Sequence, residues 1–286
     1  MTLTLIPDYD LSKHTWLGVG GKADLFAEVD NEENLISFLK NSQCPITVLG
    51  AGSNVLIRDG GISGVVLKLG ADFQKIEITG DKVIAGAGAK LMEIAQKTAK
   101  SGLAGFEFME GIPGTLGGGL ASNAGAFGSC LSDLLQEVFF TDFRGNTKTI
   151  SDFSDWGYRY SPYAHKGIFL GGVLQAKRFA SSDEISALMQ KYHEKRAASQ
   201  PQGVRTAGST FKNPKEGSAG FLLEKSGLKG YKKGNAEMST KHANFLVNHG
   251  ATATELEDFV NEVRSIVAEK QGVKLEWEVQ CLGRKR

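Results

Sequence analysis

The sequence is poor in cysteine and contains no long hydrophobic run. Its three cysteines, Cys44, Cys130 and Cys281, are odd in number and show no C-x-x-C spacing, which argues against a disulfide framework and a cysteine zinc site. Apolar runs such as 168–170 and 245–247 are far shorter than the roughly 18 residues that span a bilayer. The N-terminal segment lacks the basic and apolar regions of a secretory signal. We therefore expect a cytoplasmic protein with no membrane partner.

Net charge is almost absent. Lysine and arginine total 33, aspartate and glutamate total 32, and the formal net charge is +1. This balance removes the broad basic face that nucleic acid or an anionic membrane would need. The five histidines show no H-x-H or H-E-x-x-H spacing, so nothing favours a metal site. We expect no nucleic-acid partner and no bound metal.

Proline is scarce, with six residues, whereas glycine is in excess. The 36 glycines are about 13% of the chain, against an average near 7%. Glycine permits positive φ and lacks the Cβ that keeps a ligand away from the main chain, so glycine loops favour phosphate or cofactor binding. Tight turns between short strands are the alternative for any single loop. The clusters lie at 18–21, 50–52, 60–61, 86–88, 111–119 and 125–128.

The first 175 or so residues combine short strands with two helices. Asp30 or Asn31 can cap a helix that presents Leu35, Ile36 and Leu39 on one face, and Leu91, Ile94, Ala95 and Thr98 form a second stripe that ends at Gly102. This half is predicted to be α+β. Its β-rich segments, bounded by Gly, Asn or Asp, are 25–29, 46–49, 65–67, 82–85, 137–140 and 168–179.

The length of 286 residues predicts about two domains. The capping box Ser181–Glu184 begins a helix with apolar residues at helical spacing, and we place the domain boundary just before it. A second box, Thr252–Glu255, begins a helix whose apolar face runs from Leu256 to Val267. A strand over 274–279 is predicted to close the chain.

The sequence contains no P-loop, and 86–91 lacks the third glycine of a Rossmann motif. The segment 48–57 instead predicts a strand, a glycine turn and another strand. Successive N–H groups in such a turn can form an anion nest, and Ser53 and Asn54 can add hydrogen bonds to a pyrophosphate. In the denser cluster 111–119, Pro113 fixes one φ and favours a defined loop that presses main chain against a flat ring.

In order along the chain, these motifs resemble those of the UDP-N-acetylenolpyruvoylglucosamine reductase family. The resemblance runs from about Thr15 to Gly283, nearly the whole chain. Phe127 stands where the family often has Tyr, Tyr160 lies inside the Y-R-x-S motif, and Gln280 stands where Arg is common; these departures concern contacts at the edge of the site. The matching motifs are 50–54, 58–61, 111–118, 123–128, 158–161, 207–214 and 278–279.

The resemblance implies an α+β fold with a vanillyl-alcohol-oxidase/PCMH-type FAD-binding region over 1–178, in two subdomains split near 70. A C-terminal α+β substrate-binding domain would follow over 179–286. The chain resembles the shorter family type, which lacks a substrate-covering tyrosine insertion. The implied activity is FAD-dependent, NADPH-driven reduction of the enolpyruvyl ether of UDP-N-acetylglucosamine to UDP-N-acetylmuramate in peptidoglycan synthesis, by a monomer that binds FAD non-covalently. Attachment of the flavin to a histidine stays an alternative.

The resemblance also implies which residues contact the ligands. Weaker substrate contacts are expected at Tyr158, Arg196, Lys212 and Asn213, for the diphosphate or sugar; Arg196 also fits a solvated helix end. The FAD contacts fall on the glycine-rich loops, at Gly50, Ala51, Gly52, Ser53, Asn54, Gly111, Ile112, Pro113, Gly114, Thr115, Gly117, Gly118, Asn123, Ala124, Gly125 and Gly128.

By similarity, three residues carry the chemistry of alkene reduction. Arg159 would hold the substrate carboxylate with its planar charged fork. Glu278 would stabilise the enolate by donating a hydrogen bond, which requires it to carry a proton. Ser209 would donate the proton to C2. From the residues alone, each is more often a packing, solvated-strand or turn residue. A flavin oxidase of the same superfamily and a non-catalytic flavin- or UDP-sugar-binding module remain alternative functions.

Overall fold

The computed structural model describes residues 3–285, which divide into two compact units. Within those residues, unit 1 contains 3–6, 26–51 and 66–196, and unit 2 contains 7–25, 52–65 and 197–285. Each unit is therefore assembled from segments that are distant in sequence. The sequence boundaries expected near 70 and at 178/179 stay predictions. Over the described residues, no helix has the length and apolar character needed to cross a membrane.

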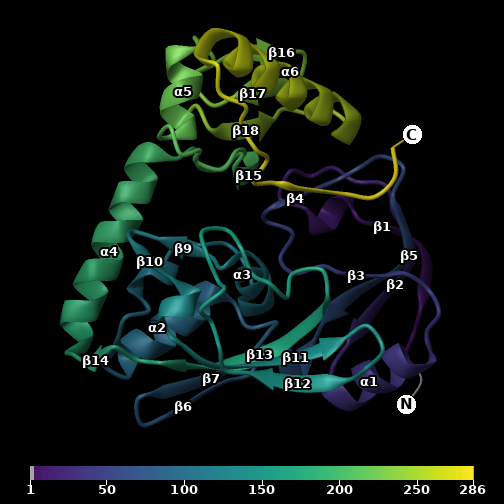
Figure 1. Ribbon diagram of the computed structural model, residues 1–286, viewed down its shortest axis with the longest axis vertical. Coiled ribbons are helices and arrows are strands. Elements are labelled where there is room, and N and C mark those ends of the chain that lie inside the picture. The colour runs from purple at the N-terminus through teal and green to yellow at the C-terminus, as the bar shows by residue number, and fades with distance from the viewer. Residues whose placement is uncertain (1–2, 286) are drawn as a thin grey trace. The chain divides into compact units, whose positions relative to one another are not determined.

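Unit 1 is built on an antiparallel sheet of order β12-β11-β13-β7-β6. Figure 1 shows α2 (Leu91–Lys100) and α3 (Leu116–Ser122) on the same side of this sheet. Side chains of both helices and of the sheet form one apolar core, which includes Phe106 and Met109. The strands are β6 (Ile76–Thr79), β7 (Lys82–Gly86), β11 (Leu135–Asp142), β12 (Thr147–Ile150) and β13 (Gly167–Gln175).

The helix starts predicted in the first 200 residues are confirmed. The Asn31 side chain accepts a hydrogen bond from Asn34 N at 2.9 Å and caps α1 (Glu32–Asn41). The Ser181 hydroxyl accepts one from Glu184 N at 3.2 Å at the start of α4 (Ser182–Ser199). The four residues predicted as the apolar stripe of α2 are all buried.

The loop predicted over 111–119 is only partly correct, because 116–122 form α3. Thr115 caps this helix by accepting a hydrogen bond from Gly118 N at 3.4 Å. A Cβ at Gly119 would lie 2.8 Å from Leu131 Cδ1, and one at Gly117 would lie 3.0 Å from Ala87 Cβ. Glycine lowers helix propensity, but here it lets the helix backbone approach its neighbours, and this packing decides the conformation.

Unit 2 has an apolar core to which the sheet β15-β18-β17-β16 and its neighbouring helices contribute side chains. Phe211, Leu223, Leu256 and Phe259 are among the side chains that bring α5 and α6 into this core. Thr252 and Glu255 form the predicted capping box of α6. The elements are β15 (Arg205–Ser209), α5 (Ala219–Lys225), β16 (Lys232–Lys233), β17 (Ala236–Met238), β18 (Phe245–Asn248) and α6 (Ala253–Gln271).

The strand predicted over 274–279 is wrong. The last strand is β19 (Gln280–Leu282), which pairs in parallel with β4 (Val55–Ile57). Residues 274–279 form only an isolated bridge, between Trp277 and Phe211. The apolar pattern of the segment is explained by burial of Leu275 and Val279 in the core of unit 2.

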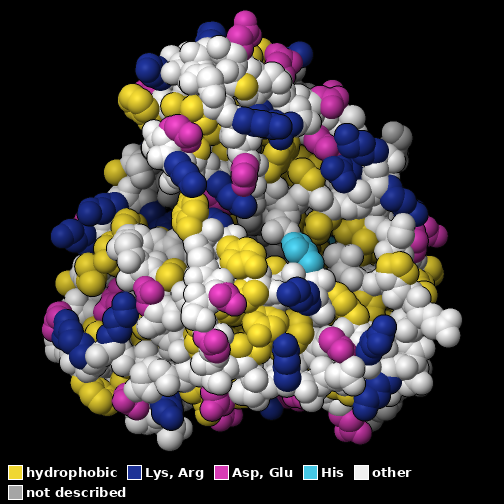
Figure 2. All heavy atoms as spheres, viewed as in Figure 1, with side chains coloured by type: hydrophobic (Ala, Val, Ile, Leu, Met, Phe, Trp, Pro, Cys, Tyr) yellow, Lys and Arg dark blue, Asp and Glu magenta, His cyan; other side chains and the backbone are white. Residues whose placement is uncertain are grey.

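The other predicted strands are confirmed, except that 168–179 divides into β13 and β14. A four-stranded sheet has the order β1-β2-β5-β3, β8 pairs with β14, and β9 pairs with β10. The face drawn in Figure 2 carries acidic and basic side chains interspersed, as the balanced composition predicts. The remaining strands are β1 (Ile6–Asp10), β2 (Lys22–Val29), β3 (Ile46–Val48), β5 (Ile62–Leu69), β8 (Leu103–Ala104), β9 (Gly125–Ala126), β10 (Ser129–Cys130) and β14 (Arg178–Phe179). Short 3-10 helices occur at η1 (Ser12–His14), η2 (Ala71–Gln74), η3 (Glu107–Met109) and η4 (Leu131–Asp133).

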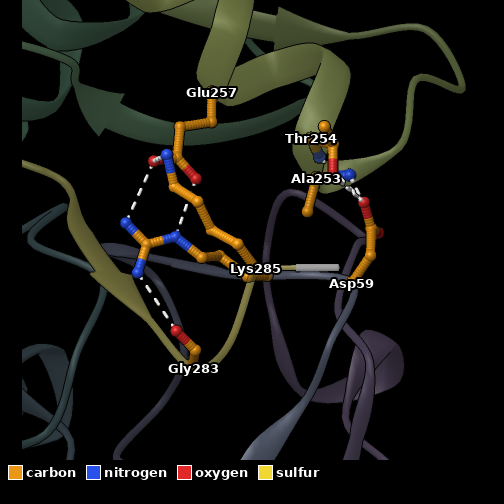
Figure 3. Close-up of polar contacts among 7 residues, drawn as sticks. Asp59, Ala253, Thr254, Glu257, Gly283 and Lys285 are labelled. Atoms are coloured by element: carbon orange, nitrogen blue, oxygen red, sulfur yellow. Dashed lines mark hydrogen bonds and ion pairs between the residues drawn. The ribbon is translucent and has the colours of Figure 1, made fainter.

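Polar contacts join the 52–65 segment of unit 2 to α6. Figure 3 shows Asp59 directed at the start of this helix, where it accepts hydrogen bonds from Ala253 N at 3.2 Å and Thr254 N at 2.9 Å. One turn further along, Glu257 receives two hydrogen bonds from the Arg58 guanidinium, at 2.7 and 3.0 Å. Because the partners are nearly 200 residues apart in sequence, these contacts fix the tertiary structure of unit 2.

Candidate active site

The first glycine turn lies between β3 and β4, as predicted, but protein contacts explain its central glycine. Gly52 has φ +66°, and a Cβ there would lie 1.8 Å from His14 O. Trp16 N also donates a hydrogen bond to Gly52 O at 3.0 Å. Gly52 is therefore needed to admit the 14–16 backbone, and a side chain at this position would disrupt the turn with or without a cofactor.

Asn54, expected to contact a pyrophosphate, uses its side-chain amide to hold another part of unit 2. Its Nδ2 donates to Glu278 O at 3.1 Å, and its main-chain oxygen accepts from Gln280 N at 3.0 Å. Asn54 thus fixes the backbone of the candidate acid Glu278. Local sequence carries no signal for this role, because the two residues are more than 200 positions apart.

In unit 1, the two glycine-rich regions predicted to bind FAD come together at Gly50 and Thr115. A Cβ built at Gly50 would lie 3.0 Å from Thr115 Oγ1. Gly118 behaves differently from its neighbours in α3, because a Cβ there would meet only Thr115 Oγ1, at 3.7 Å. Packing explains Gly117 and Gly119 but leaves Gly118 unexplained. The exposed, side-chain-free surface at Gly118 fits the approach of a flat or anionic cofactor group.

Asn123 ends α3 in the left-handed conformation, with φ +43°. Its side chain donates to Gly157 O at 3.0 Å and accepts from Ser132 N at 3.0 Å. The bond to Gly157 ties the end of the helix to the segment that carries Arg159. The predicted FAD contacts of 123–125 stay predictions, but the Asn123 amide itself is buried and hydrogen-bonded.

Arg159 occupies a tight turn in unit 1. The turn is closed by reciprocal main-chain hydrogen bonds between Gly157 and Tyr160, at 3.1 and 3.2 Å. Arg159 itself has φ +54°, a conformation that costs energy for a residue with a side chain. Its Nη1 donates to Gly125 O at 3.4 Å, and its guanidinium lies 5.1 Å from the Tyr158 ring centre. A strained, anchored arginine beside a glycine-rich loop is suited to anion binding.

Ser209 and Glu278 belong to unit 2 and lie on adjoining segments. Glu278 N donates to the main-chain oxygen of Thr210 at 2.8 Å. Ser209 ends β15, where the pairing with β18 shifts register and Gly208 has φ +75°. The backbone therefore brings together two residues that the sequence places 69 positions apart.

Asn244 is a positioning residue that sequence reasoning missed. Its side-chain oxygen accepts from Phe211 N at 3.0 Å, and its Nδ2 donates to Phe211 O at 2.8 Å. The buried Thr210 hydroxyl accepts from Leu246 N at 3.0 Å. Together these contacts fix the segment that follows Ser209. An asparagine between apolar residues, as in 243–246, is the only signal in the sequence.

The two weaker substrate candidates of unit 2 have structural contacts. Lys212 Nζ lies 3.6 Å from a Glu276 carboxylate oxygen. The main-chain N–H of Lys212 also donates a hydrogen bond to the main-chain oxygen of Glu276 at 2.9 Å. Asn213 Oδ1 accepts from Ala219 N at 3.0 Å at the start of α5. Their substrate contacts stay predictions.

Arg196 lies on α4 in unit 1, next to Gly111. A Cβ at Gly111 would be 2.8 Å from Arg196 Cδ, so the glycine admits the arginine stem. Burial lowers the pKa of Arg196, Glu110 opposes this effect, and the nearby charge of Arg159 lowers the pKa further. The charges of Arg159 and Arg196 in this unit are therefore close enough to affect each other.

Comparisons with known proteins match this organisation. Residues 23–151 match the FAD binding domain model, and 200–282 match the C-terminal domain model of UDP-N-acetylenolpyruvoylglucosamine reductase. The UDP-N-acetylenolpyruvoylglucosamine reductase of Rickettsia rickettsii (strain Sheila Smith) is 43% identical over 97% of this chain and 95% of its own length. The chain belongs to the UDP-N-acetylenolpyruvoylglucosamine reductase family. The Rickettsia typhi reductase is 42% identical over the same shares.

A solved reductase of this family supports the fold as well. The structure of MurB from Thermus caldophilus is 32% identical, covers 99% of this chain and superposes with a TM-score of 0.83. The α+β fold with an FAD-binding region and a C-terminal reductase domain is confirmed. As a UDP-N-acetylenolpyruvoylglucosamine reductase family member, the chain is an FAD-dependent oxidoreductase, a UDP-N-acetylmuramate dehydrogenase.

Proposed function

We propose that this chain reduces UDP-N-acetylglucosamine enolpyruvate to UDP-N-acetylmuramate with NADPH, in peptidoglycan synthesis. The relatives that carry the reductase name align over nearly the whole chain. The observation that carries the proposal is the adjacency of the Ser209 and Glu278 segments, joined by the Glu278 N to Thr210 O hydrogen bond of 2.8 Å. When bound, FAD supplies the hydride that adds to C3 of the alkene, and NADPH replenishes it.

Hydride addition at C3 leaves negative charge at C2 and its carboxylate, so the protein must stabilise charge. In the proposal, Arg159 binds the carboxylate with two parallel hydrogen bonds from its guanidinium. The closed turn from Gly157 to Tyr160 fixes the backbone from which this side chain extends. Lysine would keep the charge but lose the two-point geometry.

Glu278 acts on the same enolate as a hydrogen-bond donor, in its protonated form. The backbone bonds from Asn54 and to Thr210 hold it from both sides. Both of these bonds are made by the main chain of Glu278, so they fix the point from which its side chain extends. Asn54 is therefore a positioning residue for this step.

Ser209 delivers the proton to C2 and completes the lactyl ether. A serine hydroxyl is a weak acid in water, so this step needs a defined hydrogen-bonding environment. The fixed segment after Ser209, held by Asn244 and Thr210, provides a rigid support for the hydroxyl. Tyr158, Arg196, Lys212 and Asn213 bind the remainder of the substrate in this scheme.

Steady-state NADPH oxidation by the purified yellow protein tests the proposal. Oxidation should depend on the enolpyruvyl substrate and yield the lactyl ether in equal amount. A flavin oxidase would instead consume O2 after reduction by its substrate, and a binding module would show flavin absorbance without turnover. Either result would contradict the proposed function.

The proposal also includes a monomeric enzyme that acts in the cytoplasm and holds FAD without a covalent bond. Acid precipitation should release the yellow colour into the supernatant. Sedimentation at micromolar concentration should give the mass of one chain, 30.7 kDa. Colour retained in the pellet or a dimer mass would contradict these two points.

A further inference from the structure

We propose that Phe127 and Tyr192 position Arg196 to bind an anionic oxygen group of the substrate, so that this aromatic stack sets substrate affinity. All three residues belong to unit 1. The inference rests on the proposed function and adds two positioning residues to it. We call Phe127, Tyr192 and Arg196 the α4 stack.

Phe127 occupies a turn position that does not suit it. It and Gly128 connect β9 to β10, with Ala126 paired to Ser129, and their φ values are +53° and +81°. Two-residue hairpin turns with both φ values positive favour Asn-Gly, because asparagine tolerates the left-handed conformation and a bulky aromatic residue does not. The turn alone therefore does not account for phenylalanine, and the contacts of its ring do.

Those contacts are made with α4. The Phe127 ring stacks on the Tyr192 ring with centres 3.9 Å apart and an interplanar angle of 5°. The Arg196 guanidinium carbon lies 5.3 Å from the centre of the same Phe127 ring. Tyr192 and Arg196 are four residues apart, so successive turns of one helix face present them to the hairpin. Phe127 as a residue is 38% exposed, so the contact is not explained by core packing.

Arg196 lacks the hydrogen-bond partners that a half-buried guanidinium normally has. Its buried Nε has no hydrogen-bond partner, and no ion pair to Arg196 occurs within residues 3–285. One buried carboxylate oxygen of the nearby Glu110 is also without a partner. A phosphate or carboxylate group would accept from the Arg196 fork and offset the repulsion from Arg159. The aromatic contact holds the cation in place while its polar partner comes from the ligand.

Phe127→Asn separates the functional role from a structural one. Asparagine suits the turn, so melting temperature and FAD content should stay near wild type, while loss of the stack should raise KM about tenfold with little change in kcat. Phe127→Tyr keeps the ring and should keep KM within about twofold. Tyr192→Phe should likewise retain affinity, whereas Tyr192→Leu should lose it.

A double-mutant cycle tests whether the ring acts through the arginine. Arg196→Gln alone should raise KM, and adding Phe127→Asn to it should cause little further change, because the positioned group is already gone. Multiplicative losses in the double variant, or an Asn variant with unchanged KM, would overturn the proposal. Lower flavin content or melting temperature with unchanged KM would show a structural role and would also overturn it.

Binding of UDP-N-acetylglucosamine, followed by the flavin spectrum, identifies the anionic group. This probe carries the diphosphate but not the enolpyruvyl carboxylate. Weaker binding in Phe127→Asn and Arg196→Gln assigns the arginine to the diphosphate, whereas a loss limited to the enolpyruvyl compound assigns it to the carboxylate. Failure of the proposed function itself would appear differently, as wild-type protein without substrate-dependent NADPH oxidation.

Discussion

At the scale of single residues, the main chain of Glu278 has a structural role, whereas its side chain has the proposed catalytic role. Its N–H and C=O are both engaged, with Thr210 and Asn54, at 2.8 and 3.1 Å. The carboxyl group therefore extends from a backbone that is fixed on both sides. In this position a small change of side-chain length should move the reacting group while leaving the fold intact.

Substitutions of Glu278 should rank by their ability to donate a hydrogen bond at the same place. Glu278→Gln should retain more substrate-driven flavin reoxidation than Glu278→Asp or Glu278→Ala. Gln keeps a donor of nearly the same shape, Asp withdraws the group by one methylene, and Ala removes it. Rapid mixing of pre-reduced enzyme with substrate measures this directly. If Asp is faster than Gln, a charge or transferable proton is required and the neutral-donor role is wrong.

At the scale of elements, α3 distinguishes glycines that pack from a glycine that leaves a surface open. Gly118→Ala should stabilise the apoprotein slightly, by up to about 1 kcal/mol, since alanine favours helix. The same change should weaken FAD binding, because the new methyl group covers the surface beside Thr115. Fluorescence titration with FAD and denaturation of the apoprotein measure the two effects.

Gly119→Ala is the matched control in the same helix. Its Cβ would lie 2.8 Å from Leu131 Cδ1, so it should destabilise the fold by about 1–3 kcal/mol through overpacking. An unchanged FAD affinity in Gly118→Ala would assign Gly118 to a purely structural role.

The elements also show why sequence predicted some features and not others. Asn31 and Thr252 cap their helices through residues three positions away, so local patterns were sufficient. The strand β19 forms by pairing with β4, which is far away in the chain. The apolar pattern over 274–279 arises because Leu275 and Val279 are buried, not because the segment pairs with another strand. The helix α3 depends on close tertiary contacts that outweigh its poor propensity. The roles of Asn54 and Asn244 likewise arise from partners distant in sequence.

At the scale of the molecule, both units are assembled from separated segments, and the proposed catalytic residues follow this division. Arg159 belongs to unit 1, whereas Ser209 and Glu278 belong to unit 2. Unit 2 depends on the 52–65 segment, which its contacts with α6 hold in place. Among these contacts, the Arg58–Glu257 ion pair is formed by a Glu257 side chain that is only 10% exposed.

The stability supplied by this pair should depend on pH. The hydrogen bond from Arg58 lowers the pKa of Glu257 below its ordinary value of 4.5. Its contribution is therefore complete above that value and is lost as the pH falls through the lowered folded value. Glu257→Gln should reduce the free energy of unfolding by about 1–3 kcal/mol at pH 7, and the difference should shrink near pH 3.

Lys285→Gln provides the control for this measurement. Lys285 Nζ also lies near Glu257, at 3.5 Å, but its side chain is 71% exposed. Its loss should change the free energy of unfolding by less than about 0.5 kcal/mol. Urea unfolding of the wild type, Glu257→Gln and Lys285→Gln across the pH range gives the free energy of unfolding of each protein. If the loss in Glu257→Gln does not depend on pH, the ionised Glu257 carboxylate is not the source of the stability.

The most direct test of the proposed reaction follows its two halves separately in Ser209→Ala. Reduction of FAD by NADPH needs no proton donor to the substrate and should proceed at the wild-type rate. Reoxidation of the reduced enzyme by the enolpyruvyl substrate should slow by at least about 100-fold. Ser209→Thr, which retains a hydroxyl, should recover part of the rate. Equal slowing of both halves, or reoxidation at the wild-type rate, would contradict the role of Ser209 as the proton donor.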